Sequence, residues 1–244
     1  MKHSLKRNDT TNPEAVKTAA YEISDETAAI KAKRLMNRLS KHATPENFLK
    51  TSERYGLRKG ASPTKQWQAV LKMAMRRDDV IACLYDAKMR RLEKPDPKRT
   101  KEVVMFLLAQ ADGFVTDDEG ERQADGLYLG YLSFPRSAML NPERTSAEDI
   151  GALYVMMRVT LHALQRLIQR GHAISKDGEI SYQDLLTILL NVGCEAKNRM
   201  EQQSEFPATV KVESIGTQFV VKQNTPDGAM ALLTMLPPDY QKSP

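Results

Sequence analysis

The stretch from Ser146 to Gly171 has the clearest helical pattern in the sequence and limits the folds that this chain can adopt. Its apolar residues recur at steps of three and four, which places them along one side of a helix. They are Ile150, Leu153, Tyr154, Met157, Leu161, Leu164, Leu167 and Ile168. Ser146 is suited to cap the first turn, and Gly171 to the left-handed conformation that ends a helix. The pattern predicts one amphipathic helix over 146–171.

Three arginines and a histidine follow a second line along this predicted helix. Arg158, His162, Arg166 and Arg170 are spaced four residues apart, away from the apolar side. Like charges at this spacing repel by roughly 0.2–0.5 kcal/mol per pair unless a negative group balances them. Two interpretations remain open: a face that binds an anion, or a solvated face balanced by carboxylates from elsewhere in the fold.

Charge is distributed unevenly along the chain. Residues 1–101 contain 24 Lys and Arg against 12 Asp and Glu, whereas the rest contain 12 against 19. A basic segment of this kind is typical of contact with nucleic acid. The alternative is that the basic part binds an acidic protein partner, or the acidic part of a second copy of the chain.

Composition argues against several classes of protein. A length of 244 residues is ample for a hydrophobic core. Cys83 and Cys194 are far apart and suggest neither a disulfide framework nor a metal site. We find no apolar run of the roughly 18 residues that a membrane helix needs, and the N-terminus lacks the apolar segment of a secretory signal. We therefore expect a cytoplasmic protein that uses no metal, no cofactor and no membrane.

The first 94 residues are predicted to form a basic, all-helical region. One helix begins near Ser24, and its apolar face is Ala28, Ala32, Leu35, Met36 and Leu39. The same helix has a line of cations formed by Lys31, Arg34, Arg38 and Lys41. Such a line matches phosphates spaced along a backbone, although a solvated face is an equal alternative.

Further helices are predicted over 44–56 and from Pro63 onward, and the helical pattern continues to Leu92. The side chains expected to face inward from the helix at Pro63 are Trp67, Val70, Leu71, Ala74 and Met75.

A basic, proline-containing segment follows. Pro95 and Pro97 prevent a helix there, so we predict a linker over 95–101 between the helical region and a second domain over 102–244. The basic side chains in and before this linker are candidates for phosphate contacts. They are Arg90, Arg91, Lys98, Arg99 and Lys101.

The second domain is predicted to be α+β. Residues 103–108 are a short apolar run that fits a strand or a helix, and the acidic residues over 112–125 are read as a solvated loop. Alternation predicts a strand that ends before Pro135 and a C-terminal antiparallel meander, and Ser181 is expected to cap a helix that reaches about Gln203. The whole chain is therefore expected to have a helical, basic N-terminal region followed by helices packed on a small antiparallel sheet.

The sequence HALQRLIQRG over 162–171, followed by the meander that ends in Leu233-Thr234-Met235-Leu236, resembles the RelE/BrnT-like group of metal-independent ribonuclease toxins. The resemblance covers residues 150–236 and implies helices packed on an antiparallel sheet. It also implies that a histidine, an arginine or lysine, and a hydroxyl residue act on RNA. The matching candidates are His162, Arg166, Arg170, Lys222 and Thr234. Histidine titrates near neutral pH, and an arginine can bind a phosphate through two hydrogen bonds.

Three functional hypotheses follow from the sequence. The first is a nucleic-acid-binding protein whose helices and linker hold the phosphate backbone, with Arg158 as an additional contact. The second is the ribonuclease that the resemblance implies. The third is an interaction or assembly protein whose basic part docks on an acidic surface. The choice between DNA and RNA stays open.

Overall fold

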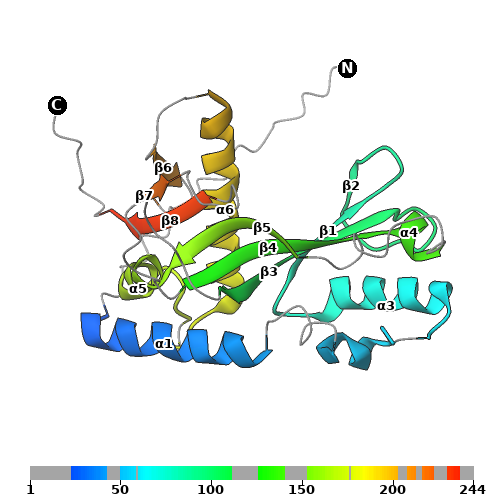
Figure 1. Cartoon of the computed structure of the whole chain (residues 1–244), viewed down its shortest axis with the longest axis horizontal. Coiled ribbons are helices and arrows are strands. Elements are labelled where there is room, and N and C mark those ends of the chain that lie inside the picture. The colour runs from blue at the N-terminus through cyan, green and yellow to red at the C-terminus, as the bar shows by residue number, and fades with distance from the viewer. Residues whose placement is uncertain are drawn as a thin grey trace, which may run out of the picture.

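The computed structural model describes residues 23–42, 50–58, 60–111, 126–140, 153–175, 177–202, 208–212, 216–222 and 230–236. These residues form an eight-stranded sheet with helices on both faces, which confirms the α+β prediction (Figure 1). The strands are β1 Ile81–Tyr85, β2 Arg91–Leu92, β3 Glu102–Ala111, β4 Gly126–Pro135, β5 Leu153–Thr160, β6 Ala208–Val212, β7 Thr217–Lys222 and β8 Met230–Met235. The helices are α1 Asp25–His42, the 3₁₀ turn η1 Glu53–Tyr55, α3 Pro63–Arg76, α4 Arg136–Leu140, α5 Leu161–Gln169 and α6 Tyr182–Gln202.

The sheet is mixed, with the strand order β2-β1-β3-β4-β5-β8-β7-β6. Neighbours are antiparallel throughout, except that β5 and β8 are parallel. The predicted C-terminal meander is confirmed as β6, β7 and β8. The meander does not form a separate small antiparallel sheet, because β8 pairs with β5 and so joins the meander to the other five strands.

The prediction that residues 1–94 are all-helical is wrong, because β1 and β2 lie within that region. Val80, Ile81 and Leu84 fit a helical spacing, but the backbone of Ile81–Tyr85 pairs with β3 instead. The segment over 95–101 connects these two paired strands. The predicted division at this segment therefore runs through one continuous sheet.

The prediction of a single helix over 146–171 is also wrong. The described part of this stretch begins as β5 and becomes helical only at Leu161. Thr160 marks the change, since its Oγ1 accepts a hydrogen bond from the backbone N–H of Ala163 at 3.1 Å. Residues 153–160 are a strand because β4 and β8 pair with them on either side. Arg158 is therefore on a strand, and the predicted line of four side chains on one helix does not form.

Several local predictions are confirmed. The apolar face of α1 is buried, α3 begins at Pro63 with Trp67 in the core, and Ser181 Oγ accepts a hydrogen bond from Asp184 N at 3.3 Å at the start of α6. Met75 was expected to face inward but is 64% exposed. The predicted start of a helix at residue 44, the acidic loop over 112–125 and the cap at Ser146 lie outside the described residues.

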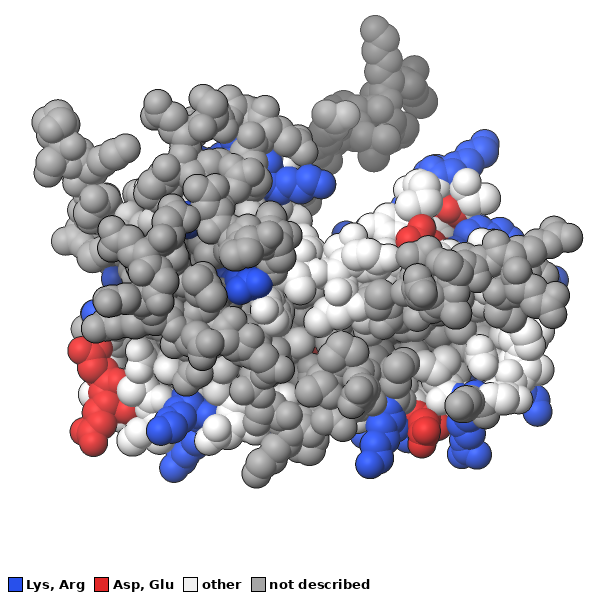
Figure 2. All heavy atoms as spheres, viewed as in Figure 1, with Lys and Arg blue, Asp and Glu red and all other residues white. Residues whose placement is uncertain are grey.

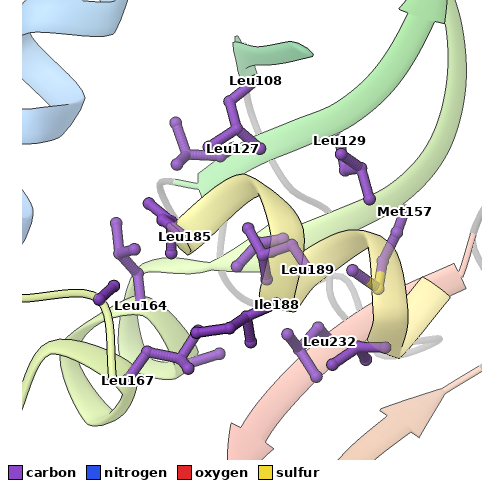
Figure 3. Packing of buried hydrophobic residues seen from close by; sticks show 14 of the residues in the cluster. Leu108, Leu127, Leu129, Met157, Leu164, Leu167, Leu185, Ile188, Leu189 and Leu232 are labelled. Carbon is purple, nitrogen blue, oxygen red and sulfur yellow. The ribbon is translucent and has the colours of Figure 1, made fainter. Parts of the chain in front are cut away.

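Two hydrophobic clusters cover opposite faces of the sheet at opposite ends. Directly paired residues share a face, so the strand registers assign each side chain. Val103, Met105 and Phe134 lie on one face and pack against α3 and α4. Leu108 and Leu129 lie on the other face and pack against side chains of α1, α5 and α6 (Figure 3). Each set of helices covers one part of one face.

Candidate nucleic-acid interface

Three aromatic side chains form a row across adjacent strands of the sheet. Phe106 on β3 pairs directly with Tyr131 on β4, and Tyr131 pairs directly with Tyr154 on β5. The Tyr131 and Tyr154 rings are stacked, with centroids 5.2 Å apart and an interplanar angle of 22°. The Phe106 and Tyr131 ring centroids are 5.8 Å apart, with a tilt of 53°. We call these three residues the aromatic row.

The aromatic row lies on the same face as Leu108 and Leu129 but further along the strands. Those two leucines are fully buried beneath the helices, whereas Phe106 and Tyr131 are only partly buried and Tyr154 is 38% exposed. Figure 2 shows uncharged surface in the hollow between the α6 side of the molecule and the protruding β2 region. Of the three rings, Tyr154 offers the most accessible surface to a ligand.

Five exposed cations lie at one end of the sheet, where β1 leads into β2 and the chain then enters β3. Arg91 is the direct cross-strand partner of Tyr85, which in turn pairs with Glu102 on the face of the aromatic row. Lys101 precedes β3, and its backbone N–H donates to the Tyr85 carbonyl at 2.7 Å. We call the five residues the basic rim, and they are Arg90, Arg91, Lys98, Arg99 and Lys101. Sequence reasoning named all five.

Two aspartates hold the turns that present the basic rim. Asp86 Oδ1 accepts hydrogen bonds from the backbone N–H groups of Lys88 at 2.8 Å and Arg90 at 3.0 Å, and its Oδ2 accepts from Arg90 Nε at 2.9 Å. The hydrogen bonds from Arg90 lower the pKa of Asp86 to about 2. Asp96 Oδ1 accepts from the backbone N–H groups of Lys98 and Arg99, which lowers its pKa. Both turns are therefore fixed by ionised carboxylates at neutral pH.

The line of cations on α1 does not act as one free face. Lys31 Nζ donates to the Gly178 carbonyl at 2.6 Å, so this ammonium is used within the fold. Arg34 is exposed, and Arg38 lines a cleft further along the helix. Lys41 lies in the last turn of α1, and its side chain is outside the described part of the chain.

The residues proposed for ribonuclease chemistry are dispersed. His162 is exposed on α5 and faces a shallow groove shared with Asp25 and Glu26 of α1. Arg166 forms an ion pair with Asp25 at 3.4 Å, and the Arg170 guanidinium donates to the Leu236 carbonyl.

The other two candidates for this chemistry are on strands. Lys222 pairs with Ala231, which pairs with Arg158. These residues lie across the sheet from the face on which α5 packs. Thr234 is partly buried on β8, opposite Val220. Arg158 is buried, with its guanidinium 5.1 Å from the centre of the Tyr128 ring. The structure therefore does not bring His162 and Lys222 together.

Sequence reasoning missed the aromatic row. The sequence predicts a strand that ends before Pro135, which includes Tyr131, but it places Tyr154 on the apolar side of a helix and fits 103–108 to a strand or a helix. Alternation alone would have shown that each ring can face outward from a strand. The row itself depends on the register between three strands, which the sequence does not state.

The described residues include no group of three or more His, Cys, Asp or Glu side chains that could hold a metal ion. Within the same residues, no helix is both long enough and apolar enough to cross a membrane. Comparison of the chain with protein-family models, with curated proteins and with solved structures gives no match.

Proposed function

We propose that this protein binds single-stranded nucleic acid, with bases stacked on the aromatic row and phosphates held by the basic rim. The observation that carries the proposal is the directly paired series Phe106, Tyr131 and Tyr154 on an open part of the sheet. Stacking of bases on aromatic side chains, beside cations that contact the backbone, is the common mode of single-strand recognition.

A single strand fits this surface better than a duplex does. The bases of a duplex are stacked on one another and show only their edges in the grooves. The face of an aromatic ring stacks on the face of a base, which requires an unstacked base. The basic rim supplies no sequence preference, since phosphates are the same at every position.

The residues have separate roles under this proposal. Tyr131 is central because its ring contacts both neighbours in the row. Tyr154 is the most exposed ring and offers the largest free surface to a base. Arg91 is the direct partner of Tyr85 and holds a phosphate at one end of the sheet. The Lys101 ammonium donates to the Lys98 carbonyl at 3.1 Å, so it is already used in part within the fold. Because all five rim side chains are exposed, their attraction for phosphate depends on salt concentration.

Fluorescence anisotropy with an end-labelled, unstructured 15-nucleotide strand tests the proposal, using DNA and RNA as separate ligands and a duplex of the same sequence as a third. We expect binding to the single strands and much weaker binding to the duplex. Tyr131→Ala and Tyr154→Ala are each expected to weaken single-strand binding by about 5- to 100-fold, from a stacking contribution of about 1–3 kcal/mol per base.

Tyr128→Ala is the matched control, because Tyr128 lies on the same strand as Tyr131 but on the opposite face. It should lower affinity little. Arg91→Gln and Arg99→Gln should each flatten the dependence of log Kd on log salt by about 0.7, which corresponds to one released counterion on a single strand. Equal binding by wild type, Tyr131→Ala and Tyr154→Ala would refute the proposal, as would a preference for the duplex.

A further inference from the structure

A cleft of about 590 Å³ lies at the edge of β3, where Leu107 and Leu108 follow Phe106 of the aromatic row. The first residue of β1, Ile81, pairs with Phe106, so this edge of β3 has no strand partner at Leu107 and Leu108 among the described residues. The hydroxyl of Tyr182, the first residue of α6, takes the place of a strand there and accepts a hydrogen bond from the Leu108 N–H at 3.1 Å. One wall of the cleft is therefore formed by Leu107, Leu108 and the hydroxyl group of Tyr182, which the hydrogen bond holds in place.

Two arginines from different elements line the cleft. Arg38 comes from α1 and Arg54 from η1, and both are exposed. Within the described part of the chain, neither guanidinium forms an ion pair with a carboxylate. Arg54 lies 4.9 Å from the centre of the Tyr55 ring, which leaves its hydrogen-bonding edge available to a ligand.

The cleft is also lined by Arg77 and Asp79, which pair with each other, and by Asp78. The buried guanidinium of Arg77 donates to Asp79 Oδ1 at 2.7 Å and to Ser52 Oγ at 2.9 Å, so this pair is neutral as a unit. Asp78 is exposed at the wall. Two cations and one carboxylate therefore remain for a ligand. The first turn of α6 also lines the cleft, and the positive end of this 21-residue helix adds to the attraction for an anion.

We propose that this cleft binds a small phosphate monoester of the size of a nucleoside monophosphate. Two guanidinium groups suit a dianionic phosphate, because each can donate two hydrogen bonds to its oxygens. Asp78 suits a hydroxyl or amino group elsewhere on the same molecule, since an ionised carboxylate only accepts hydrogen bonds. The volume lies within the range of about 300–1,000 Å³ that is usual for small-molecule sites. None of the described residues that line this cleft belongs to the aromatic row or to the basic rim.

Isothermal titration calorimetry with adenosine 5′-monophosphate, adenosine and inorganic phosphate tests this site in the full chain. We expect the monophosphate to bind more tightly than either part alone. Arg38→Met and Arg54→Met should each weaken its binding by about 10- to 100-fold, because each removes charge-assisted hydrogen bonds. Arg34→Met is the matched control, because Arg34 is an exposed arginine of the same helix that does not line the cleft.

Three results would overturn the proposal: no binding of the monophosphate by the wild type, equal affinity for adenosine, or an equal loss in Arg34→Met. Emission from the buried Trp67 checks that each variant is folded. Tyr131→Ala separates the two sites. It should keep binding of the monophosphate unchanged even if single-strand binding is lost, and loss of both would argue against an independent cleft site.

Discussion

Gly130 of β4 lies directly against β5, and replacing it with alanine tests the packing between the strands that carry Tyr131 and Tyr154. The register between these strands shifts between Leu129 and Gly130. A Cβ atom at position 130 would lie 2.7 Å from Leu153 Cδ1 and 2.9 Å from the Tyr154 carbonyl oxygen. The leucine side chain can rotate away, but the carbonyl belongs to the paired strand. Gly130→Ala therefore requires β5 to move at the residue that carries the outermost ring of the row.

The expected loss of stability comes from the contact with the Tyr154 carbonyl oxygen, because that contact cannot be relieved by rotating a side chain. Inserting a methyl group into a closely packed site costs about 1–3 kcal/mol, and a contact with backbone belongs in the upper half of that range. We expect Gly130→Ala to lower the free energy of unfolding by about 2 kcal/mol. Urea denaturation followed by Trp67 emission measures this value, since Trp67 is the one tryptophan of the chain and is buried beneath the sheet.

Gly193→Ala is the control with the opposite sign. Gly193 lies within α6, and a Cβ atom there would meet Leu129 Cδ2 at 3.7 Å and Met156 Cε at 4.0 Å, which are ordinary contact distances. Alanine is favoured over glycine in a helix by about 0.8–1.0 kcal/mol, so this variant should be more stable than the wild type. A free energy of unfolding for Gly130→Ala that differs from the wild-type value by less than about 0.5 kcal/mol would contradict this prediction. A difference of that size is expected for a surface substitution that disturbs no contact.

Three further pairs of groups give predictions. In urea titrations, Asp79→Ala should destabilise the protein by about 2 kcal/mol, which is more than Arg77→Met should. The buried member of this pair is the guanidinium, and removing Asp79 leaves that charge without its carboxylate partner. Asp86→Asn should lower the urea midpoint at pH 6 but not at pH 2, since a pKa lowered to about 2 adds stability above about pH 4 that is lost as pH falls toward 2. Burial and the neighbouring Arg170 lower the pKa of His172, so stability should fall as pH drops below about 6.5, and His172→Gln should remove that part of the fall.

Helices that are specified by local pattern were predicted correctly from the sequence. The apolar spacing of α1, the proline that begins α3 and the serine that caps α6 are all properties of a few consecutive residues. The same spacing rule failed at β5. Leu153, Met157, Leu161 and Leu164 satisfy a helical period, although the first two lie on a central strand whose backbone is satisfied by two neighbours. Tertiary pairing outweighed the pattern there, as it did at β1.

The two parts of the proposed interface differ in the same way. The basic rim lies within residues 90–101, so its charge is visible in a short segment. The aromatic row combines residues separated by more than twenty positions at each step and exists only through the register of β3, β4 and β5. Composition and periodicity do not contain that register. A sequence can therefore indicate that a chain has phosphate contacts and still give no sign of the surface on which bases would stack.

The location of the aromatic row has a physical cause in the way that helices are distributed over the sheet. An antiparallel sheet with one solvated face normally carries polar side chains there. Here α3 and α4 cover one face at the β1 end, and α1, α5 and α6 cover the other face toward β8, so one part of the second face has no described helix over it. Positions 106, 131 and 154 belong to neither hydrophobic cluster, so polar residues there would leave both clusters intact. Three rings occupy them instead and leave apolar surface partly exposed, which fits the base-stacking role that we propose. The hydroxyl groups of Tyr131 and Tyr154 suit rings that are partly buried and partly in contact with water.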